Sequence, residues 1–336
     1  MNSLEHAHLA CSKGWFEPLT IATLSAGRIN DSYRITCAAE PGEFVLQAVN
    51  MRVFPNAPQL VQQLARVVDH LNQRRPGWVP ELLPTRTQVR HLRHGDRVWR
   101  LWRFVGGEAL RPEACSRSVL QERLRAAGRA FATTQVLLED LPGERLLPGI
   151  DHHHDLDYFL QAFDGLSAQT SDLWRERVAR FRVQPEALKT HDGYIHGDCK
   201  PDNLLFQPGS AEVAAVLDLD TVMWGNRALD FGDLVRSSVW QQEAFDIALF
   251  AALLDGFVHG QRSSSQPIEP EQLLDAPVFV SFMLSLRYLI DHLQGDLAFK
   301  VQQHGDNLQR AERQYRRTEA LHAAHSEMAQ VIAQWR

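Results

Sequence analysis

YIHGDCKPDNLLF, at residues 194–206, is the stretch of this chain that decides its fold. It places a carboxylate, Asp198, five residues before an amide, Asn203, and an acidic stretch, VLDLD, follows at residues 216–220. An acid can accept a proton, while an amide and a later acid, Asp218, can hold a metal ion against phosphate oxygens. This series indicates phosphoryl transfer, which needs in-line positioning, charge neutralisation by Mg²⁺ and a base for the attacking hydroxyl.

The residues between the two acids predict a β-hairpin. Leu204–Phe206 reads as a short apolar strand, residues 207–210 as a turn, and Val213–Leu219 as a second apolar strand. Such a hairpin brings Asn203 and Asp218 to the same end, facing one cavity. The simpler structural alternative is that the acids only cap a turn and end a strand, with no metal bound.

Composition limits the class of protein. At 336 residues and a net charge of −6, the chain can form two lobes and has no dense basic stripe for nucleic acid. Its four cysteines form no C-x-x-C pair, which predicts free thiols in a reducing compartment. The start of the chain lacks the pattern of a signal peptide. The apolar stretch Ile247–Val258 is short and interrupted by Asp255, so it predicts a buried helix. We expect a soluble, cytoplasmic protein that binds neither nucleic acid nor membrane.

The order of predicted elements divides the chain into two parts. Strands are predicted at Thr20–Leu24, Phe44–Val49 and Val98–Val105, with a helix at Gln59–Leu71, and the pattern becomes helical after a glycine pair at 106–107. We therefore predict an α+β, bilobal, protein-kinase-like fold. Residues 1–105 would form a small β-rich N-lobe that covers the nucleotide. Residues 106–336 would form a larger, mostly helical C-lobe with the catalytic loop, the metal site and the acceptor site. The later predicted helices are Ser118–Leu137, Leu156–Phe163, Ser171–Phe181, Phe231–Trp240, Ala244–His259, Glu271–Leu293 and Leu308–Trp335.

The nucleotide side departs from the usual kinase pattern. The loop at residues 25–32 lies where kinases cover the phosphates, but it has one glycine, so an ordinary hairpin turn is the alternative. Gln47 occupies the place of the lysine in V-A-I-K, and the predicted helix 59–71 has no glutamate, only Asp69. Both halves of the usual ion pair are thus missing together, and Arg28 or Arg52 could supply the charge. The predicted nucleotide-binding residues are Gly27, Arg28, Gln47, Phe104 and Val105.

Two further motifs have competing interpretations. Residues 218–221 read D-L-D-T, similar to the D-x-D-x-T motif that opens haloacid-dehalogenase-type phosphatases, but the later lysine which that chemistry needs could only be Lys300. Asp230 suits a helix N-cap, and Arg236, one turn into the helix, could pair with Asp220 or touch the substrate. The histidine tract at 152–154 predicts a surface turn before a helix, because adjacent histidines cannot all face one ion.

These motifs resemble those of the aminoglycoside phosphotransferase/choline kinase superfamily, whose signature is H-G-D-x-x-x-x-N followed by a hydrophobic strand and an acid. The flanking motifs are most similar to those of the N-acetylhexosamine 1-kinases, and the likeness spans about residues 18–315. His292 departs from that group, which commonly has an aromatic residue there, and so does Trp224, where proline is frequent. The matching stretches are IND-S at 29–32, LQ at 46–47, DLDTVM at 218–223, DFGD at 230–233 and RYLIDHLQGD at 287–296.

The resemblance implies a sugar kinase. ATP and Mg²⁺ would be used, and the γ-phosphoryl group would pass to the anomeric hydroxyl of an N-acetylhexosamine. Asp198 would accept or orient the sugar proton, while Asn203 and Asp218 would hold Mg²⁺. The candidate acceptor-binding residues are Asn30, Asp31, Asp220, Arg236 and Arg287.

Other acceptors and another class of protein remain open at this point. For Asn30 and Asp31 the alternative is turn chemistry, and for Arg287 it is an ion pair with Asp291 on the same helix. An aminoglycoside, choline or another alcohol could replace the sugar. Because the phosphate-binding lysine is missing, a non-catalytic nucleotide-binding module is a further alternative.

Overall fold

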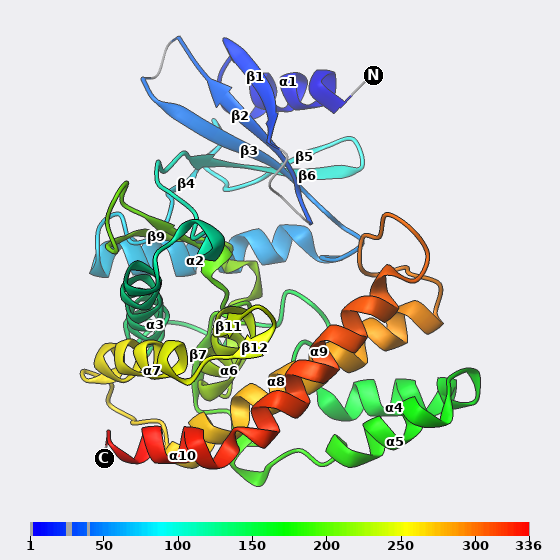
Figure 1. The fold of residues 1–336 in the computed structure, drawn as a ribbon. Coiled ribbons are helices and arrows are strands. Elements are labelled where there is room, and N and C mark those ends of the chain that lie inside the picture. The colour runs from blue at the N-terminus through cyan, green and yellow to red at the C-terminus, as the bar shows by residue number, and fades with distance from the viewer. Residues whose placement is uncertain (1–2, 25–28, 39–40, 336) are drawn as a thin grey trace.

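The computed structural model describes residues 3–24, 29–38 and 41–335 (Figure 1). Its N-terminal part is an antiparallel sheet in the order β1-β2-β3-β6-β4, with β5 paired to β6. The strands are β1 (Thr20–Leu24), β2 (Asp31–Thr36), β3 (Glu43–Val49), β4 (Leu82–Leu83), β5 (Leu92–His94) and β6 (Arg97–Arg103). The larger part below this sheet is mostly helical, so the predicted α+β, kinase-like fold is confirmed.

Alternation along the central strands separates a core face from a cleft face. In β3, Phe44, Leu46 and Ala48 are buried in one cluster, while Gln47 points to the other face. The register pairs Gln47 with Arg100 of β6, so these two polar residues lie side by side on the cleft face. The core face is covered by α1 (Ser3–Gly14), a helix that the sequence reasoning did not predict.

The helix α2 (Ala57–Arg74) connects the sheet to the larger core. Its apolar positions recur at helical spacing and are buried in the same cluster as the helices of the C-terminal part. The next long helix, α3 (Arg117–Leu137), begins at Ser116, whose hydroxyl accepts a hydrogen bond from the Val119 backbone N–H. Helix α3 packs closely against α7 (Ile247–Gln261), because glycines such as Gly256 bring the two backbones together.

The remaining helices build the lower part of the molecule (Figure 1). They are α4 (Leu156–Leu166), α5 (Asp172–Phe181), α6 (Ala228–Ser238), α8 (Pro270–Leu293), α9 (Asp306–Ala323) and α10 (His325–Ala333). By length and composition alone α8 could cross a membrane, but 67% of its most apolar window is buried inside the protein. It lies between α6 and α9, as a core helix does.

The predicted elements are largely confirmed, with three corrections. The last predicted helix is two helices, because α9 ends at Ala323 and α10 starts at His325. Helix α7 begins at Ile247 and not at Ala244, since β12 (Ala244–Phe245) pairs with β11 (Trp240–Gln241), and this pairing also shortens α6. The division of the chain at residues 105 and 106 stays a prediction.

Candidate active site

The predicted hairpin after the catalytic segment is present and sets the geometry of the site. Strands β8 (Leu204–Phe206) and β9 (Val213–Val216) are antiparallel, and the Leu217 backbone N–H donates to the Asn203 carbonyl at 2.8 Å. The ends that carry Asn203 and Asp218 therefore adjoin. The second strand is shorter than predicted, because Asp218 adopts a left-handed backbone (φ 59°) and residues 219–221 form a 3₁₀ turn.

Asp198 lies in a network of donors that keeps it ionised. Asn203 Nδ2 donates to the Asp198 carbonyl at 2.8 Å and to its carboxylate Oδ2 at 3.0 Å, and the Lys200 ammonium bonds to the same Oδ2. Burial alone would raise the pKa of Asp198, but Lys200, His196 and Asn203 together lower it to about 2. The carboxylate is thus an anion at neutral pH, able to accept a hydrogen bond from a substrate hydroxyl.

A buried carboxylate on α6 holds the backbone of the catalytic loop. Asp230 accepts hydrogen bonds from the backbone N–H groups of His196 (2.8 Å) and Gly197 (2.9 Å) and from Gln135 Nε2 (2.7 Å). Its predicted N-cap role is wrong, because Arg227 occupies the N-cap of α6. Asp230 instead fixes the two residues that precede Asp198, with only 1% of its surface exposed.

The acids around Asp218 are suited to a divalent cation. Burial, followed by the charges of Asp220 and Asp198, raises the pKa of Asp218 to about 6. Two carboxylates thus act on Asp218, and a cation would relieve their repulsion. Asn203 uses Nδ2 for both of its bonds to Asp198, which leaves its Oδ1 as the atom for a metal. Carboxylate and amide oxygens are ligands that Mg²⁺ accepts.

A cavity of about 490 Å³ lies between the sheet and the hairpin. Its wall includes Asn203, Asp218 and the three predicted nucleotide-binding residues that the structure describes, Gln47, Phe104 and Val105. The other two, Gly27 and Arg28, lie outside the described residues. The structure thus joins the predicted metal ligands to an apolar-edged cavity next to the residues that follow β6.

Sequence reasoning missed Arg100, the buried cation of this cavity. Its guanidinium makes a bidentate pair with Asp220 (Nη1 to Oδ1 2.5 Å, Nη2 to Oδ2 2.8 Å), and its Nε donates to Gln47 Oε1 at 3.0 Å. Arg52, one of the arginines predicted to replace the missing lysine, is exposed after β3. The contact of Arg100 with Gln47 follows from the strand order, which places β6 beside β3. Strand order cannot be read from the sequence, so Arg100 was missed.

Three of the predicted acceptor residues lie on the sheet side of the site. Asn30 donates to Asp220 Oδ2 at 3.1 Å and accepts from the Asn50 backbone at 2.9 Å, so its amide has structural bonds. Asp31 forms an exposed ion pair with Arg97 at 3.1 Å. Asp220 is buried and bound to Arg100.

The other predicted acceptor residues gather near Asp198. Arg236 donates to Asp233 at 2.7 Å and not to Asp220. Burial lowers the pKa of Arg236, but the charges of Asp233 and Asp198 raise it by more. The pKa of Arg236 therefore lies above its ordinary value. Burial lowers the pKa of Arg287, which Asp198 and Asp233 counteract. Arg287 does not pair with Asp291, which accepts the backbone N–H groups of residues 298 and 299.

The histidine tract also contributes to this region. Its turn before α4 is confirmed, but His153 and His154 are only partly exposed, and both rings lie within hydrogen-bonding distance of the Gly197 carbonyl. Burial and the nearby Arg287 lower the pKa of His153 to about 4, so its ring is neutral at pH 7. Sequence reasoning missed this contact, because it depends on how residues 150–155 turn toward the catalytic loop.

Comparison with known proteins identifies the family. Residues 20–263 match the model of the phosphotransferase enzyme family. The chain belongs to this family and is an enzyme, a phosphotransferase that uses a hydroxyl group as acceptor.

Solved structures share the fold at low sequence identity. An aminoglycoside phosphotransferase from Alicyclobacillus acidocaldarius is 14% identical, with 97% of this chain and 96% of that chain covered and a TM-score of 0.65. A choline kinase from Cryptosporidium parvum is 10% identical, with 97% and 94% covered and a TM-score of 0.63. A microcompartment-associated aminopropanol kinase is 15% identical, with 97% and 99% covered and a TM-score of 0.62. At these identities the likeness establishes the fold, and the acceptor must be argued from the site.

Proposed function

We propose that this protein is an ATP-dependent kinase that phosphorylates a hydroxyl group of a neutral sugar, most specifically the anomeric hydroxyl of an N-acetylhexosamine. The observation that carries the choice of acceptor is the charge beside Asp198. Three cations, Lys200, Arg236 and Arg287, stand there with three carboxylates, those of Asp198, Asp218 and Asp233. Opposite charges in equal number suit an uncharged acceptor with many hydroxyl groups.

Cationic acceptors fit this region less well. A polycationic aminoglycoside would have to approach two arginines that are already present. A choline-like acceptor needs open aromatic faces, but Arg287 lies over Phe159 (5.3 Å to the ring centroid) and over Phe299 (5.5 Å). The protein's own cation therefore already lies over these two rings.

The chain's own residues supply positioning and proton handling. Asp198 Oδ1 would accept the hydrogen bond of the attacking hydroxyl, while Asn203 and Lys200 hold the carboxylate in place through its Oδ2. Asn203 Oδ1 and Asp218 would hold Mg²⁺, which neutralises phosphate charge when it is bound. Arginine and carboxylate side chains at the acceptor side would direct several hydrogen bonds to the sugar, so an analogue that lacks one hydroxyl should be rejected strongly.

The test is Mg²⁺-dependent ADP release from ATP across a panel of acceptors. The panel contains N-acetylglucosamine, N-acetylgalactosamine, galactose, choline and kanamycin, and the control is Asp198→Asn. We expect release with the amino sugars and a loss of turnover of roughly 10²–10⁴-fold in the variant. Release only with choline or kanamycin would overturn the sugar assignment. ATP binding without turnover on any acceptor would favour a non-catalytic nucleotide-binding module.

A further inference from the structure

The ion pair between Arg100 and Asp220 joins the sheet to the metal loop, residues 218–221, inside the cavity. Arg100 is 2% exposed and Asp220 is 3% exposed, and the two form a bidentate pair. A buried guanidinium in a cavity of this size needs a reason, because a buried ion pair by itself adds little to stability. Its position beside Gln47 suggests that reason.

In protein kinases, a lysine on the third strand pairs with a glutamate on the following helix and holds the α- and β-phosphates. Here the third strand carries Gln47, and the only acid of α2, Asp69, bonds to Arg90 at 3.0 Å. We infer that Arg100 and Asp220 are the relocated form of that pair. The cation has moved one strand across the sheet, the acid has moved from the helix to the metal loop, and Arg100 binds the α- and β-phosphates. This inference rests on the proposed use of ATP.

The hydrogen bonds of Arg100 leave donors for a phosphate. A guanidinium has five N–H groups. One, on Nε, donates to Gln47, and one from each terminal nitrogen reaches Asp220. Two N–H groups therefore remain, one on each terminal nitrogen, and each can donate one charged hydrogen bond to a phosphate oxygen.

The same contacts explain the glutamine. Gln47 Oε1 accepts from Arg100 Nε at 3.0 Å and from Trp102 Nε1 at 2.7 Å, while its Nε2 donates to Ser32 Oγ at 3.1 Å. Each polar atom of the amide is thus used to orient the guanidinium. A lysine in its place would bring a second cation against Arg100, so the loss of the usual lysine follows from the gain of the arginine.

Comparing the binding of ATP with that of adenosine tests this inference. A merely structural role of Arg100 would not change the affinity for ATP alone. The Kd values of ATP and of adenosine are measured by calorimetry in Mg²⁺ for the wild type, Arg100→Gln and the matched control Arg97→Gln, which changes an exposed arginine of the same strand. We expect Arg100→Gln to weaken ATP by roughly 10–100-fold, as for loss of charged hydrogen bonds. Adenosine binding and the control variant should stay at the wild-type values.

A second variant covers the risk that Asp220, left without its partner, unfolds the protein. Arg100→Gln with Asp220→Asn removes both charges together, so that no buried charge is left unpaired, and it should lose ATP affinity by a similar factor. Equal weakening of ATP and adenosine, or no weakening of either, would refute the role of Arg100. The failure of the wild type to bind ATP at all would instead refute the proposed function.

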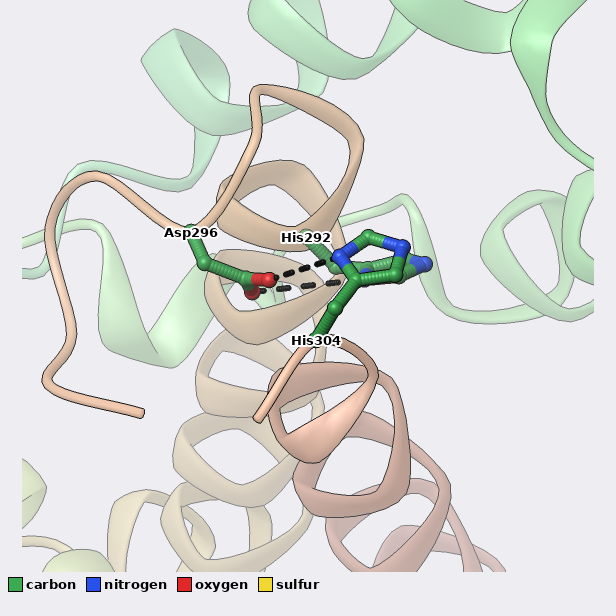
Figure 2. A group of neighbouring side chains, drawn as sticks. All are labelled: His292, Asp296 and His304. Atoms are coloured by element: carbon green, nitrogen blue, oxygen red, sulfur yellow. Dashed lines mark hydrogen bonds and ion pairs between the residues drawn. The ribbon is translucent and has the colours of Figure 1, made fainter. Parts of the chain in front are cut away.

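A separate observation points to a metal site far along the chain. Figure 2 shows His292 at the end of α8, Asp296 in the turn that follows and His304 just before α9, with their polar atoms directed toward one another. His304 Nδ1 lies 3.1 Å from one Asp296 oxygen and His292 Nδ1 lies 4.0 Å from the other. One ligand atom from each residue lies within 4.8 Å of the others.

This group is held in place by its surroundings. Asp296 is 6% exposed in its side chain, has a left-handed backbone (φ 62°) and accepts a hydrogen bond from Asn307 Nδ2 at 2.8 Å. His292 Nδ1 is buried and has no hydrogen-bond partner in the described part of the chain. A buried ring nitrogen directed at a carboxylate and a second imidazole is a vacant ligand atom, since such atoms are normally satisfied.

We propose that His292, Asp296 and His304 bind a transition-metal dication of the zinc class. Two imidazoles and one carboxylate favour Zn²⁺ over Mg²⁺, which prefers oxygen ligands, and water would complete a tetrahedral set. Zinc ligands lie about 2.0–2.2 Å from the ion, so the three atoms must draw closer together. His304 can do this because its side chain is 79% exposed. The ion would link the end of α8 to the start of α9 and fix the segment between them. That segment contains Phe299, whose ring packs against Arg287.

Zinc binding to metal-stripped protein tests this second proposal independently of catalysis. Zn²⁺ is titrated in buffer that contains Mg²⁺, so that oxygen-ligand sites are already filled. We expect one equivalent to bind the wild type and His259→Ala, an exposed control histidine. Binding should weaken by more than about 100-fold in His292→Ala and in His304→Ala, because losing a ligand exceeds the 10–100-fold cost of losing a supporting contact. Equal zinc uptake by all four proteins, or none by the wild type, would refute the site.

Discussion

Removing the carboxylate of Asp230 should destabilise the protein and its catalytic loop together. Asp230→Ala leaves the backbone N–H groups of His196 and Gly197 without their acceptor, as well as the amide of Gln135. Each unsatisfied buried donor costs about 1–3 kcal/mol. For the three donors the sum, roughly 3–9 kcal/mol, is a large share of the 5–15 kcal/mol by which proteins of this kind are stable. Asp230→Asn keeps one acceptor oxygen and should lose about half as much.

The assay is urea unfolding at pH 7, with the unfolding free energy extrapolated to water and the slope m compared between proteins. Asp164→Ala is the matched control, because among the described residues its carboxylate makes only an exposed pair with Arg182, so its loss should cost no more than about 1 kcal/mol. Turnover should fall in Asp230→Ala even where the protein is folded, since His196 and Gly197 lead directly to Asp198. A loss below about 1 kcal/mol with unchanged m would show that the loop does not depend on this carboxylate.

Three other changes test the metal site, the histidine contact and the helix packing. Asp218→Ala removes a predicted ligand and should abolish Mg²⁺-dependent ADP release; a wild-type metal dependence would mean that another acid holds the ion. His153 has a folded pKa of about 4, below the ordinary 6.5, so its contribution to stability is lost as pH falls from 6.5 towards 4, by up to about 1.4 kcal/mol per pH unit. In His153→Gln this slope should decrease, and unfolding free energies at pH 5 and 7 measure the difference; an unchanged slope would contradict the buried neutral ring. A Cβ at Gly256 would lie 1.7 Å from the Arg125 carbonyl, so Gly256→Ala should destabilise the protein by about 1–3 kcal/mol, whereas Gly165→Ala, in open space on α4, should be neutral or stabilising. Equal thermal stability of these two glycine variants would rule out the close helix contact.

The sequence was sufficient for the features that depend on neighbouring residues. The spacing of Asp198 and Asn203 and the hairpin that follows are local, so their arrangement could be predicted. The periodicity of α2 and α8 likewise depends on residues within the same helix. The missed α1 is short and weakly amphipathic, and its burial depends on the sheet that it covers. The position of α1 therefore depends on contacts with residues distant in the sequence, which local patterns do not reveal.

The contacts of Asp220 and Asp230 illustrate the same limit within the site. Both acids were identified from the sequence, but Asp230 bonds to residues 33 and 34 positions earlier, and Asp220 to a residue 120 positions earlier. A carboxylate at the start of a helix is commonly a cap, so the local interpretation of Asp230 was reasonable and wrong. No property of the sequence near Asp220 indicates that its partner lies on β6, because strand order is a property of the folded sheet.

The arginines of the site would determine which substrates bind, whereas other residues carry out the chemistry. The catalytic motif supplies Asp198, Asn203 and Asp218, which any phosphoryl transfer of this type requires, and it carries no information about the acceptor. Arg100 lines the cavity, whereas Arg236 and Arg287 are not among its lining residues and lie within electrostatic reach of Asp198. Arg100 would then select a negatively charged substrate group, as phosphate is. Arg236 and Arg287, whose charges are balanced by carboxylates, would select a neutral sugar. Changing Arg100 should then alter nucleotide affinity without altering the ranking of acceptors, while changing Arg287 should alter the ranking. A shift of both properties by either variant would mean that Arg100 and Arg287 do not act separately.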